Sequence, residues 1–459
     1  MSLKAAQRSQ QITSAPIRAL LLKLTGSALM GNVAMHTLGI VDTFFISRLG
    51  TTQLAAASFV IPVYMVYVSL ALGIGMGMSS LNSRLIGEGR FDDSRRLIRD
   101  GLIFAFIFAV TMAALGALTI DSLFRLLGAE SNTLPFISRY MSVLLLGLPP
   151  LMLVTIGNST FRSMGNIKMS ATLAMVMSVM NIIFDPLLIF CIGPFPELGI
   201  QGAAWATMLA AFLTLGLSFY VLAFHEKLLD LTMPAIEHIK DHWKKILSIG
   251  IPAMGANMMT PLAAAIMTAM VASYGDEMVA GLGVGSRIEM LSLLVVMALS
   301  ATLPMFIGQN LGAGHRDRAR SALLGSLAFV LGFQVIIYIL LLVFSSQIAA
   351  VFTNNTNVME VIIWYLMILP LTYGAHGVVV LVMVSLNVLR RPRTALMLTI
   401  IRLMVLYLPL AWLGSQLMGI RGLFIGAACG NVLAGLIAYG IIRQISAVEL
   451  SPEQNLQAS

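Results

Sequence analysis

The sequence predicts an all-α integral membrane protein with twelve transmembrane helices in two pseudo-symmetric six-helix bundles. Composition is the first reason: hydrophobic residues make up 58% of the 459 residues and charged residues only 10%, and the mean hydropathy is +0.91. These values lie far from the averages of soluble domains. The second reason is that the apolar residues form runs of about 17 to 25 residues or more, which is long enough to cross a bilayer as helices.

The first half of the chain contains six such runs. A polar, basic stretch of fifteen residues precedes them. The first run is too long for the apolar region of a cleaved signal peptide, so we expect it to be a retained helix. The six predicted spans lie near residues 17–46, 53–84, 96–119, 135–163, 168–192 and 200–224.

The second half repeats this arrangement after an amphipathic stretch, "FHEKLLDLTMPAIEHIKDHWK", which we expect to lie along the cytoplasmic surface. The sequence thus predicts an N-terminal bundle (1–223), a cytoplasmic linker (224–245), a C-terminal bundle (246–445) and a cytoplasmic tail (446–459). The six spans of the second half lie near residues 247–273, 278–310, 319–346, 360–388, 395–414 and 420–442.

An internal repeat relates the two halves. At one constant offset along the chain, Gly50 matches Gly275 and Gly87 matches Gly312. Basic loops recur at nearly the same spacing, as "FRSMGNIKMSA" and "LRRPRTALM". Six spans per half is an even number, so both copies have the same orientation in the membrane. Two related bundles suit a transporter that opens alternately to either side.

The distribution of positive charge predicts the orientation. If the N-terminus is cytoplasmic, the inner loops and helix ends hold most of the 28 Lys and Arg, and only four Arg lie outside. We therefore expect a multi-pass protein of the cell (cytoplasmic or inner) membrane with both termini in the cytoplasm. The net charge of +8 indicates contact with anionic membrane lipids and no nucleic-acid partner.

Acidic residues inside the first bundle are the strongest functional signal. Asp42 lies inside an apolar run that carries no other charge back to Lys23, and Asp185 lies in the fifth span. A charge at bilayer depth costs roughly 2.5 to 3.5 kcal/mol on insertion scales, so such acids usually face a water-filled cavity and mark an ion path. The alternative is that each acid only pairs locally, Asp42 with Arg48 for example. The second half has no acid at either equivalent position.

The fifth span adds an amide to this pattern. Asn181 and Asp185 are four residues apart, so they lie on one face of a helix. Pro186 removes one backbone hydrogen bond beside them. If Asp42 approaches this face, one proton or one Na⁺ can be held between the two carboxylates, with Asn181 as a neutral ligand.

Other polar residues within the spans support two interpretations. Arg287, Glu289 and Arg402 either form structural pairs or line the second bundle, and His376 is either a buried structural histidine or a titratable group. No P-loop, HExxH, CxxC or GxSxG motif occurs in a suitable context. The sequence therefore predicts no enzyme activity, no cofactor and no resident metal, and energy would come from an ion gradient.

Several motifs together resemble the multidrug and toxic compound extrusion (MATE) family. They are "VDTFFISRLG" at the end of the first span, "FRSMGNIKMS" after the fourth and "FIGQNLGAGHRDRAR" after the eighth, on a duplicated twelve-span pattern that covers nearly the whole chain. The acids are similar to those of the DinF-like branch, which carries an Asp in the first span and an Asn and an Asp in the fifth. Asn158 and Thr207 of this chain match polar residues in the fourth and sixth spans of that branch.

The resemblance implies a secondary active multidrug efflux antiporter. It would export organic cations or other amphipathic compounds in exchange for protons by alternating access, with Asp42, Asp185, Asn181, Asn158 and Thr207 as its ion-coupling and substrate residues. The coupling ion would be H⁺ or, alternatively, Na⁺ at Asp42, Asp185 and Asn181. We expect a monomer. A lipid-linked saccharide flippase of the same superfamily, a channel and a membrane enzyme are the more distant alternatives.

Overall fold

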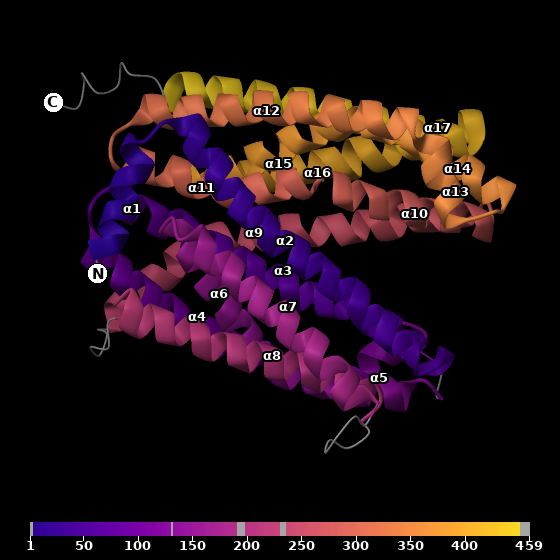
Figure 1. Ribbon diagram of the computed structural model, residues 1–459, viewed down its shortest axis with the longest axis horizontal. Coiled ribbons are helices and arrows are strands. Elements are labelled where there is room, and N and C mark those ends of the chain that lie inside the picture. The colour runs from indigo at the N-terminus through magenta and orange to yellow at the C-terminus, as the bar shows by residue number, and fades with distance from the viewer. Residues whose placement is uncertain (1–2, 130–131, 191–197, 230–235, 450–459) are drawn as a thin grey trace. The chain divides into compact units, whose positions relative to one another are not determined.

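The computed structural model describes residues 3–129, 132–190, 198–229 and 236–449, and every regular element in these ranges is a helix. The chain divides into two compact units (Figure 1). The first unit contains Met1–Ser14 and Gly26–Met254, and the second contains Ala15–Thr25 and Gly255–Ser459. Each unit is a bundle of helices.

The first bundle is formed by the helices of the first half of the chain. Its central helix is α6, which packs against α3, α4, α7 and α8. The elements are α1 (Leu3–Ser14), α2 (Ile17–Ser47), α3 (Thr51–Gly87), α4 (Phe91–Leu126), α5 (Leu134–Leu146), α6 (Leu148–Ser163), α7 (Ile167–Ile189), α8 (Ile200–Tyr220) and the π-helix η1 (Val221–His225).

The second bundle has a corresponding central helix, α15, which packs against α11, α12, α16 and α17. The elements of the second half are α9 (Ile236–Ala272), α10 (Asp276–Ser292), α11 (Leu294–Gly312), α12 (Arg316–Val343), α13 (Ser345–Phe352), α14 (Thr356–Ile368), the 3₁₀-helix η2 (Leu369–Thr372), α15 (Tyr373–Val388), α16 (Pro392–Ile400), the π-helix η3 (Ile401–Tyr407) and α17 (Leu408–Glu449).

Ten helices of the described residues are long and apolar enough to cross a membrane, and eleven if α5 and α6, bent by 47°, count as one span. One of the ten covers Pro392–Ser446, with 55 residues and a kink at Met418 and Gly419. This kink separates the last two predicted spans. All twelve predicted spans therefore consist of helices in the described residues, some with a short break inside, which confirms the predicted fold class.

The predicted linker falls partly on α9. Residues 236–244 form the first turns of that helix, which continues without a break into the seventh span. Residues 230–235 lie outside the described ranges. In the first turns of α9, Trp243 donates from Nε1 to the backbone oxygen of Asp100 at 2.9 Å, and His242 Nδ1 lies 2.7 Å from Asp100 Oδ2. These contacts fasten the start of α9 to α4.

The repeat seen in the sequence also sets where helices begin and end. At the offset that relates the glycines, the first residue of α3 corresponds to that of α10, α4 to α12, α6 to α15 and α7 to α16. The turns between them match as well: Gly89 and Gly314 both have positive φ, at 73° and 80°. Glycine adopts this conformation readily because it has no β-carbon. The two halves therefore share one backbone plan.

The copies differ in how their helices are interrupted. Helix α3 runs for 37 residues through Pro62, whereas its counterpart in the second half is divided into α10 and α11 at Leu293. Helix α7 is regular, whereas the corresponding segment after α16 is the π-helix η3. Such π segments are often found at functional sites.

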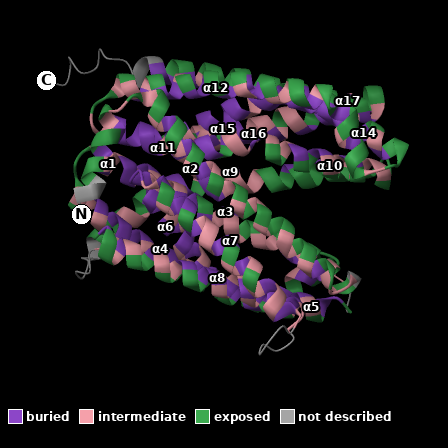
Figure 2. Ribbon diagram, in the orientation of Figure 1, coloured by how far each residue is buried: buried purple, intermediate pink, exposed green. Residues whose placement is uncertain are grey.

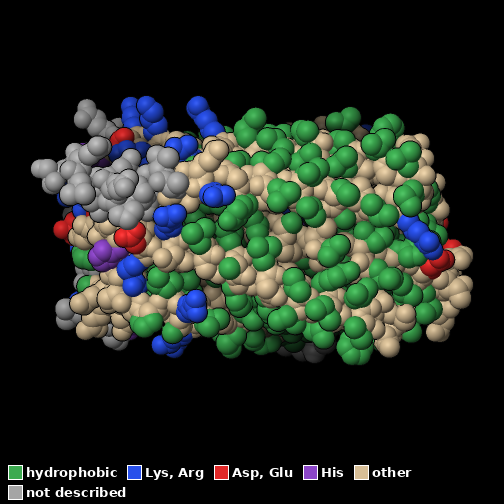
Figure 3. Space-filling view, turned by 90° about the horizontal axis from the view of Figure 1, so that it is seen from above, with side chains coloured by type: hydrophobic (Ala, Val, Ile, Leu, Met, Phe, Trp, Pro, Cys, Tyr) green, Lys and Arg blue, Asp and Glu red, His purple; other side chains and the backbone are tan. Residues whose placement is uncertain are grey.

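Burial follows the requirements of helices in lipid. Buried residues line the inside of each bundle and exposed residues lie on its outer helix faces (Figure 2). Figure 3 shows the face that includes α12 and α17 of the second bundle, where hydrophobic side chains cover the middle and charged side chains gather toward the ends. This distribution matches a bundle whose middle faces hydrocarbon and whose ends face water.

Candidate functional site

Three of the predicted site residues form one hydrogen-bonded group in the first bundle. Asn181 and Asp185 lie on α7 and are 1% and 0% exposed, and Thr207 lies on α8, which packs against α7. With its amide oriented so that both polar atoms are bonded, Asn181 donates from Nδ2 to Asp185 Oδ2 at 2.8 Å and accepts from Thr207 Oγ1 at 2.9 Å. The spacing of four residues therefore does place the amide beside the acid.

Asp42 belongs to the same neighbourhood. It lies near the end of α2, and its carboxylate is close enough to Asp185 for the two charges to interact. Its Oδ1 atom is buried and has no hydrogen-bond partner among the described residues. An unsatisfied carboxylate oxygen in a buried setting is costly unless a proton or a cation binds it.

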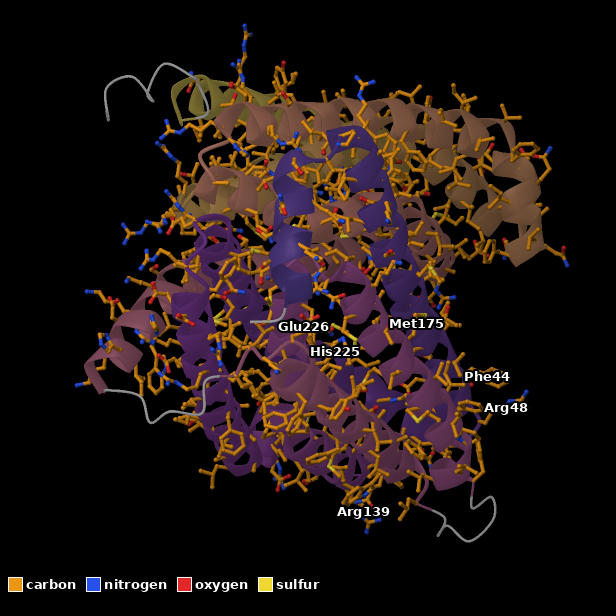
Figure 4. All side chains as sticks on the ribbon, turned by 60° about the vertical axis from the view of Figure 1, so that its left-hand side comes forward. Phe44, Arg48, Arg139, Met175, His225 and Glu226 are labelled. Carbon is orange, nitrogen blue, oxygen red and sulfur yellow. The ribbon has the colours of Figure 1, made fainter. Side chains whose placement is uncertain are left out.

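Arg48 does not neutralise Asp42. The Arg48 guanidinium lies over the ring of Phe44, 5.0 Å from its centroid, and both side chains lie together at the end of α2 (Figure 4). Within the described ranges, no ion pair joins Arg48 to Asp42. The local pairing that was the alternative for Asp42 is therefore absent from this part of the chain.

Asn158 is the fifth predicted site residue. It lies on α6, and its Oδ1 atom is buried without a hydrogen-bond partner in the ranges described. No hydrogen bond connects it to the four residues above. The structure thus brings together Asp42, Asn181, Asp185 and Thr207, and it leaves Asn158 with an open acceptor on α6.

Two tyrosines complete the group, and sequence reasoning missed both. Tyr64 on α3 and Tyr140 on α5 lie close enough to Asp42 to interact with its charge, and Tyr140 also interacts with Asp185. Tyr64 and Thr207 line a small cavity of about 10 Å³, close to the volume that one water requires. A search limited to charged residues overlooks tyrosines, but the repeat offers a signal, because it aligns Tyr140 with Tyr365.

The chemistry of this acidic site follows from its atoms. Two carboxylates, one amide and three hydroxyl groups offer oxygen ligands and hydrogen-bond donors, with no positively charged residue paired to either acid in the described residues. Such a set can bind one small cation or a proton and release it when its surroundings change. In the described chain, no three His, Cys, Asp or Glu side chains are arranged to hold a metal ion.

Comparisons with known proteins identify the family of the chain. The MatE family profile matches residues 28–187 and 252–413. A curated relative, the FAD transporter of Shewanella oneidensis, is 41% identical over 95% of this chain and 96% of its own length. The probable multidrug resistance protein YoeA of Bacillus subtilis is 25% identical over 90% of each chain.

A solved structure shows the same fold. The crystal structure of the Vibrio cholerae MATE transporter VcmN in the bent form matches with a TM-score of 0.89 and 31% identity, covering 96% of this chain and 99% of that one. The two segments matched by the family profile fall one in each half of the chain. The chain therefore belongs to the MatE family and is a secondary transporter, not an enzyme.

Proposed function

We propose that this chain exports flavin nucleotides such as FAD in exchange for protons, by alternating access, with the acidic site of the first bundle as its coupling site. The observation that carries the coupling is the pairing of two acids, Asp42 and Asp185, in a buried setting that supplies hydrogen bonds but, among the described residues, no positive partner. Two nearby carboxylates favour holding one proton between them, because their charges repel.

The exchange would work by changing the charge of the acidic site. When a proton enters from outside, the site loses one negative charge and the hydrogen bonds around Asn181 and Asp185 rearrange. When the proton leaves to the cytoplasm, the carboxylate oxygen of Asp42 again lacks a partner. A protein whose two opening states differ in their affinity for the proton couples the proton gradient to the conformational change.

The substrate class is supported by similarity. The relative named as an FAD transporter shares 41% identity over almost the whole chain, whereas YoeA, named as a probable multidrug resistance protein, shares 25%. Organic cations and other amphipathic drugs are a second candidate. The negative charge of the acidic site favours them, since a cation can replace the proton there.

We also place the chain in the DinF-like branch of the family. The support is the position of the acids, with Asp42 in the first span and Asn181 and Asp185 in the fifth, and the lack of any acid in the seventh span. The excess of Lys and Arg at the loops of one side supports a location in the cytoplasmic membrane with both termini inside, and we propose a monomer.

Proteoliposomes test this proposal. The full-length protein is reconstituted and given either a pH gradient alone or a Na⁺ gradient alone, and the movement of FAD and of a fluorescent organic cation is measured. We expect FAD movement with the pH gradient and none with the Na⁺ gradient. Asp42→Asn and Asp185→Asn should reduce it to the leak of empty vesicles, while Asp121→Asn, at an exposed acid of α4, serves as the control. Normal exchange by both site variants would contradict the assignment.

A further inference from the structure

A second polar cluster lies in the other bundle, and the coupling mechanism above does not use it. Glu289 on α10 accepts a hydrogen bond from the hydroxyl of Tyr365 on α14, and its Oε1 lies 3.7 Å from Nδ1 of His376 on α15. Arg402 on η3 is close enough to interact with the charges of Glu289 and His376. A carboxylate, an imidazole and a guanidinium thus lie near one another inside the second bundle.

Arg402 is the unusual member of this cluster. It donates from Nε to Asn431 Oδ1 at 3.3 Å, and Asn431 in turn donates from Nδ2 to Thr372 Oγ1 at 3.4 Å. Its two terminal nitrogens donate no hydrogen bond to any side chain or backbone group that the structure describes. A guanidinium that is held at one nitrogen, with its outer fork unused, is expensive at bilayer depth and points to a ligand.

The cluster is also reachable. The Glu289 and His376 side chains are 27% and 14% exposed, so the cluster is partly accessible and not fully sealed within the core. Arg402 is the second residue of η3, and π segments are frequent at functional sites. The Nε contact holds the guanidinium at one nitrogen and leaves its terminal nitrogens available as a fork of donors.

We propose that Arg402 binds the phosphate groups of an anionic substrate, with Glu289 as its counter-charge when no substrate is bound. The inference rests on the proposed export of flavin nucleotides and identifies the part of the substrate that the second bundle recognises. A guanidinium fork matches two oxygens of a phosphate or diphosphate with parallel hydrogen bonds. Glu289 neutralises Arg402 in the empty protein, and an entering diphosphate takes its place beside the guanidinium.

Binding to the full-length protein in detergent tests this site. Calorimetry measures the affinity for inorganic pyrophosphate, for FAD and for riboflavin, which lacks phosphate. We expect wild-type protein to bind FAD at least about tenfold more tightly than riboflavin. Arg402→Gln should abolish that ratio and pyrophosphate binding, and Arg402→Lys should retain only part of both. Arg287→Gln, which removes an exposed positive charge from α10, should change neither.

Glu289→Gln is expected to change the affinity for pyrophosphate in the opposite direction to Arg402→Gln. If Glu289 competes with the phosphate for Arg402, removing its charge should strengthen pyrophosphate binding severalfold. If the pair only stabilises the bundle, Glu289→Gln should instead weaken binding as Arg402→Gln does, and that result would overturn the inference. So would an unchanged preference for FAD over riboflavin in Arg402→Gln.

A competition experiment separates the two sources of phosphate. Short-chain phosphatidylglycerol and FAD are each added against pyrophosphate. Displacement by FAD supports the inference, and displacement by the lipid alone overturns it in favour of a headgroup site. The results also stand apart from the proteoliposome test. If Arg402→Gln binds FAD as wild type does and proton-driven FAD transport is intact, only the phosphate site is rejected. If pyrophosphate binding depends on Arg402 but no FAD is transported, only the proposed function is rejected.

Discussion

The two bundles share a backbone plan and differ in the chemistry placed on it. At positions that the repeat aligns, the first bundle has Tyr64 and Tyr140 and the second has Glu289 and Tyr365. The first bundle adds two acids, Asp42 and Asp185, which have no acidic counterpart. The second adds Arg402 and His376 from other helices. Equivalent places in the two copies thus carry a negative cluster in one and a balanced cluster in the other.

The two halves share the positions that helix packing requires, whereas their polar positions differ. Glycine positions that allow close approach between helices occur in both copies, as do the turns with positive φ. The buried charges follow no such repeat. Because each buried charge costs several kcal/mol unless it binds a ligand or is paired, the asymmetry supports the separate roles that we propose for the two clusters.

The largest effect should separate the tasks of the two clusters. Asp185→Asn is expected to lower proton-driven transport to background, because it removes an acid that we propose holds the exchanged proton. Glu289→Gln should leave the dependence on the pH gradient in place, since its carboxylate belongs to the other cluster. Initial rates in proteoliposomes at several pH gradients measure this. Equal loss of proton dependence in both variants would contradict the assignment of proton coupling to the first bundle alone.

The shared packing should produce similar costs in both bundles. A β-carbon on Gly202 would lie 2.4 Å from the backbone oxygen of Leu188, and one on Gly422 would lie 2.0 Å from that of Gly414. Gly202→Ala and Gly422→Ala should each destabilise the protein by about 1 to 3 kcal/mol or more, because backbone must move.

Melting temperatures in detergent measure these two substitutions. Gly216→Ala and Gly440→Ala are the matched controls, because nothing lies within 4 Å of a β-carbon at either glycine. Full stability of Gly422→Ala beside a destabilised Gly202→Ala would show that the close approach matters in only one copy.

A smaller effect should distinguish the equivalent tyrosines. Tyr365→Phe removes the hydroxyl that donates to Glu289, and a hydrogen bond to a charged group contributes about 1.5 to 3 kcal/mol. Tyr140→Phe should cost less, since Tyr140 only lies near its acids. Thermal unfolding of the two variants gives the comparison. A larger loss for Tyr140→Phe would show that the first-bundle tyrosine makes the stronger contact.

The smallest effect concerns one end of the second bundle. Glu277, just before the eighth predicted span, accepts hydrogen bonds from the amides of Asn355 and Asn357, each at 2.8 Å. The bond from Asn355, and then that from Asn357, lowers the pKa of Glu277 below its ordinary value of 4.5. A lowered pKa in the folded state stabilises the protein above pH 4.5, and this contribution is lost as the pH falls below that value.

The corresponding measurement is the melting temperature between about pH 6 and about pH 3. Glu277→Gln should remove part of the decrease in melting temperature that wild-type protein shows as the pH falls. This change in melting temperature should be smaller than the one caused by Tyr365→Phe. The first bundle has Thr52 at the equivalent position, so Thr52→Ala is expected to leave the pH dependence unchanged. An identical pH dependence in Glu277→Gln and wild type would contradict the role of the amides.

The sequence alone predicted the spans, the duplication and the group of Asp42, Asn181 and Asp185, because hydrophobic runs and a spacing of four residues translate directly into helices and helix faces. It did not predict Tyr64 and Tyr140, whose contacts depend on how α3 and α5 pack against α2 and α7. Nor does the sequence show whether Asn158 bonds to this group, since the rotation of a helix about its axis is set by packing against its neighbours.

Glu289 shows the same limit. Its neighbour in sequence, Arg287, was one candidate for a structural pair, but residues two apart on a helix point in different directions. In the structure, Arg287 is exposed, while Glu289 contacts Tyr365 and lies near His376, which come from helices distant in the sequence. Long-range partners of this kind are chosen by the fold.

The π-helix η3 has a consequence for how the two copies diverged. A π turn holds about one residue more than an α turn, and each residue advances an α-helix by about 100°. The side chains that follow η3 therefore point in other directions than the side chains at the corresponding positions of α7. Deleting a single residue within Ile401–Tyr407 should restore an ordinary helix and swing Arg402 away from its neighbours. The π segment thus changes which side chains of this helix face the inside of the second bundle, and the two copies can differ there although they share one backbone plan.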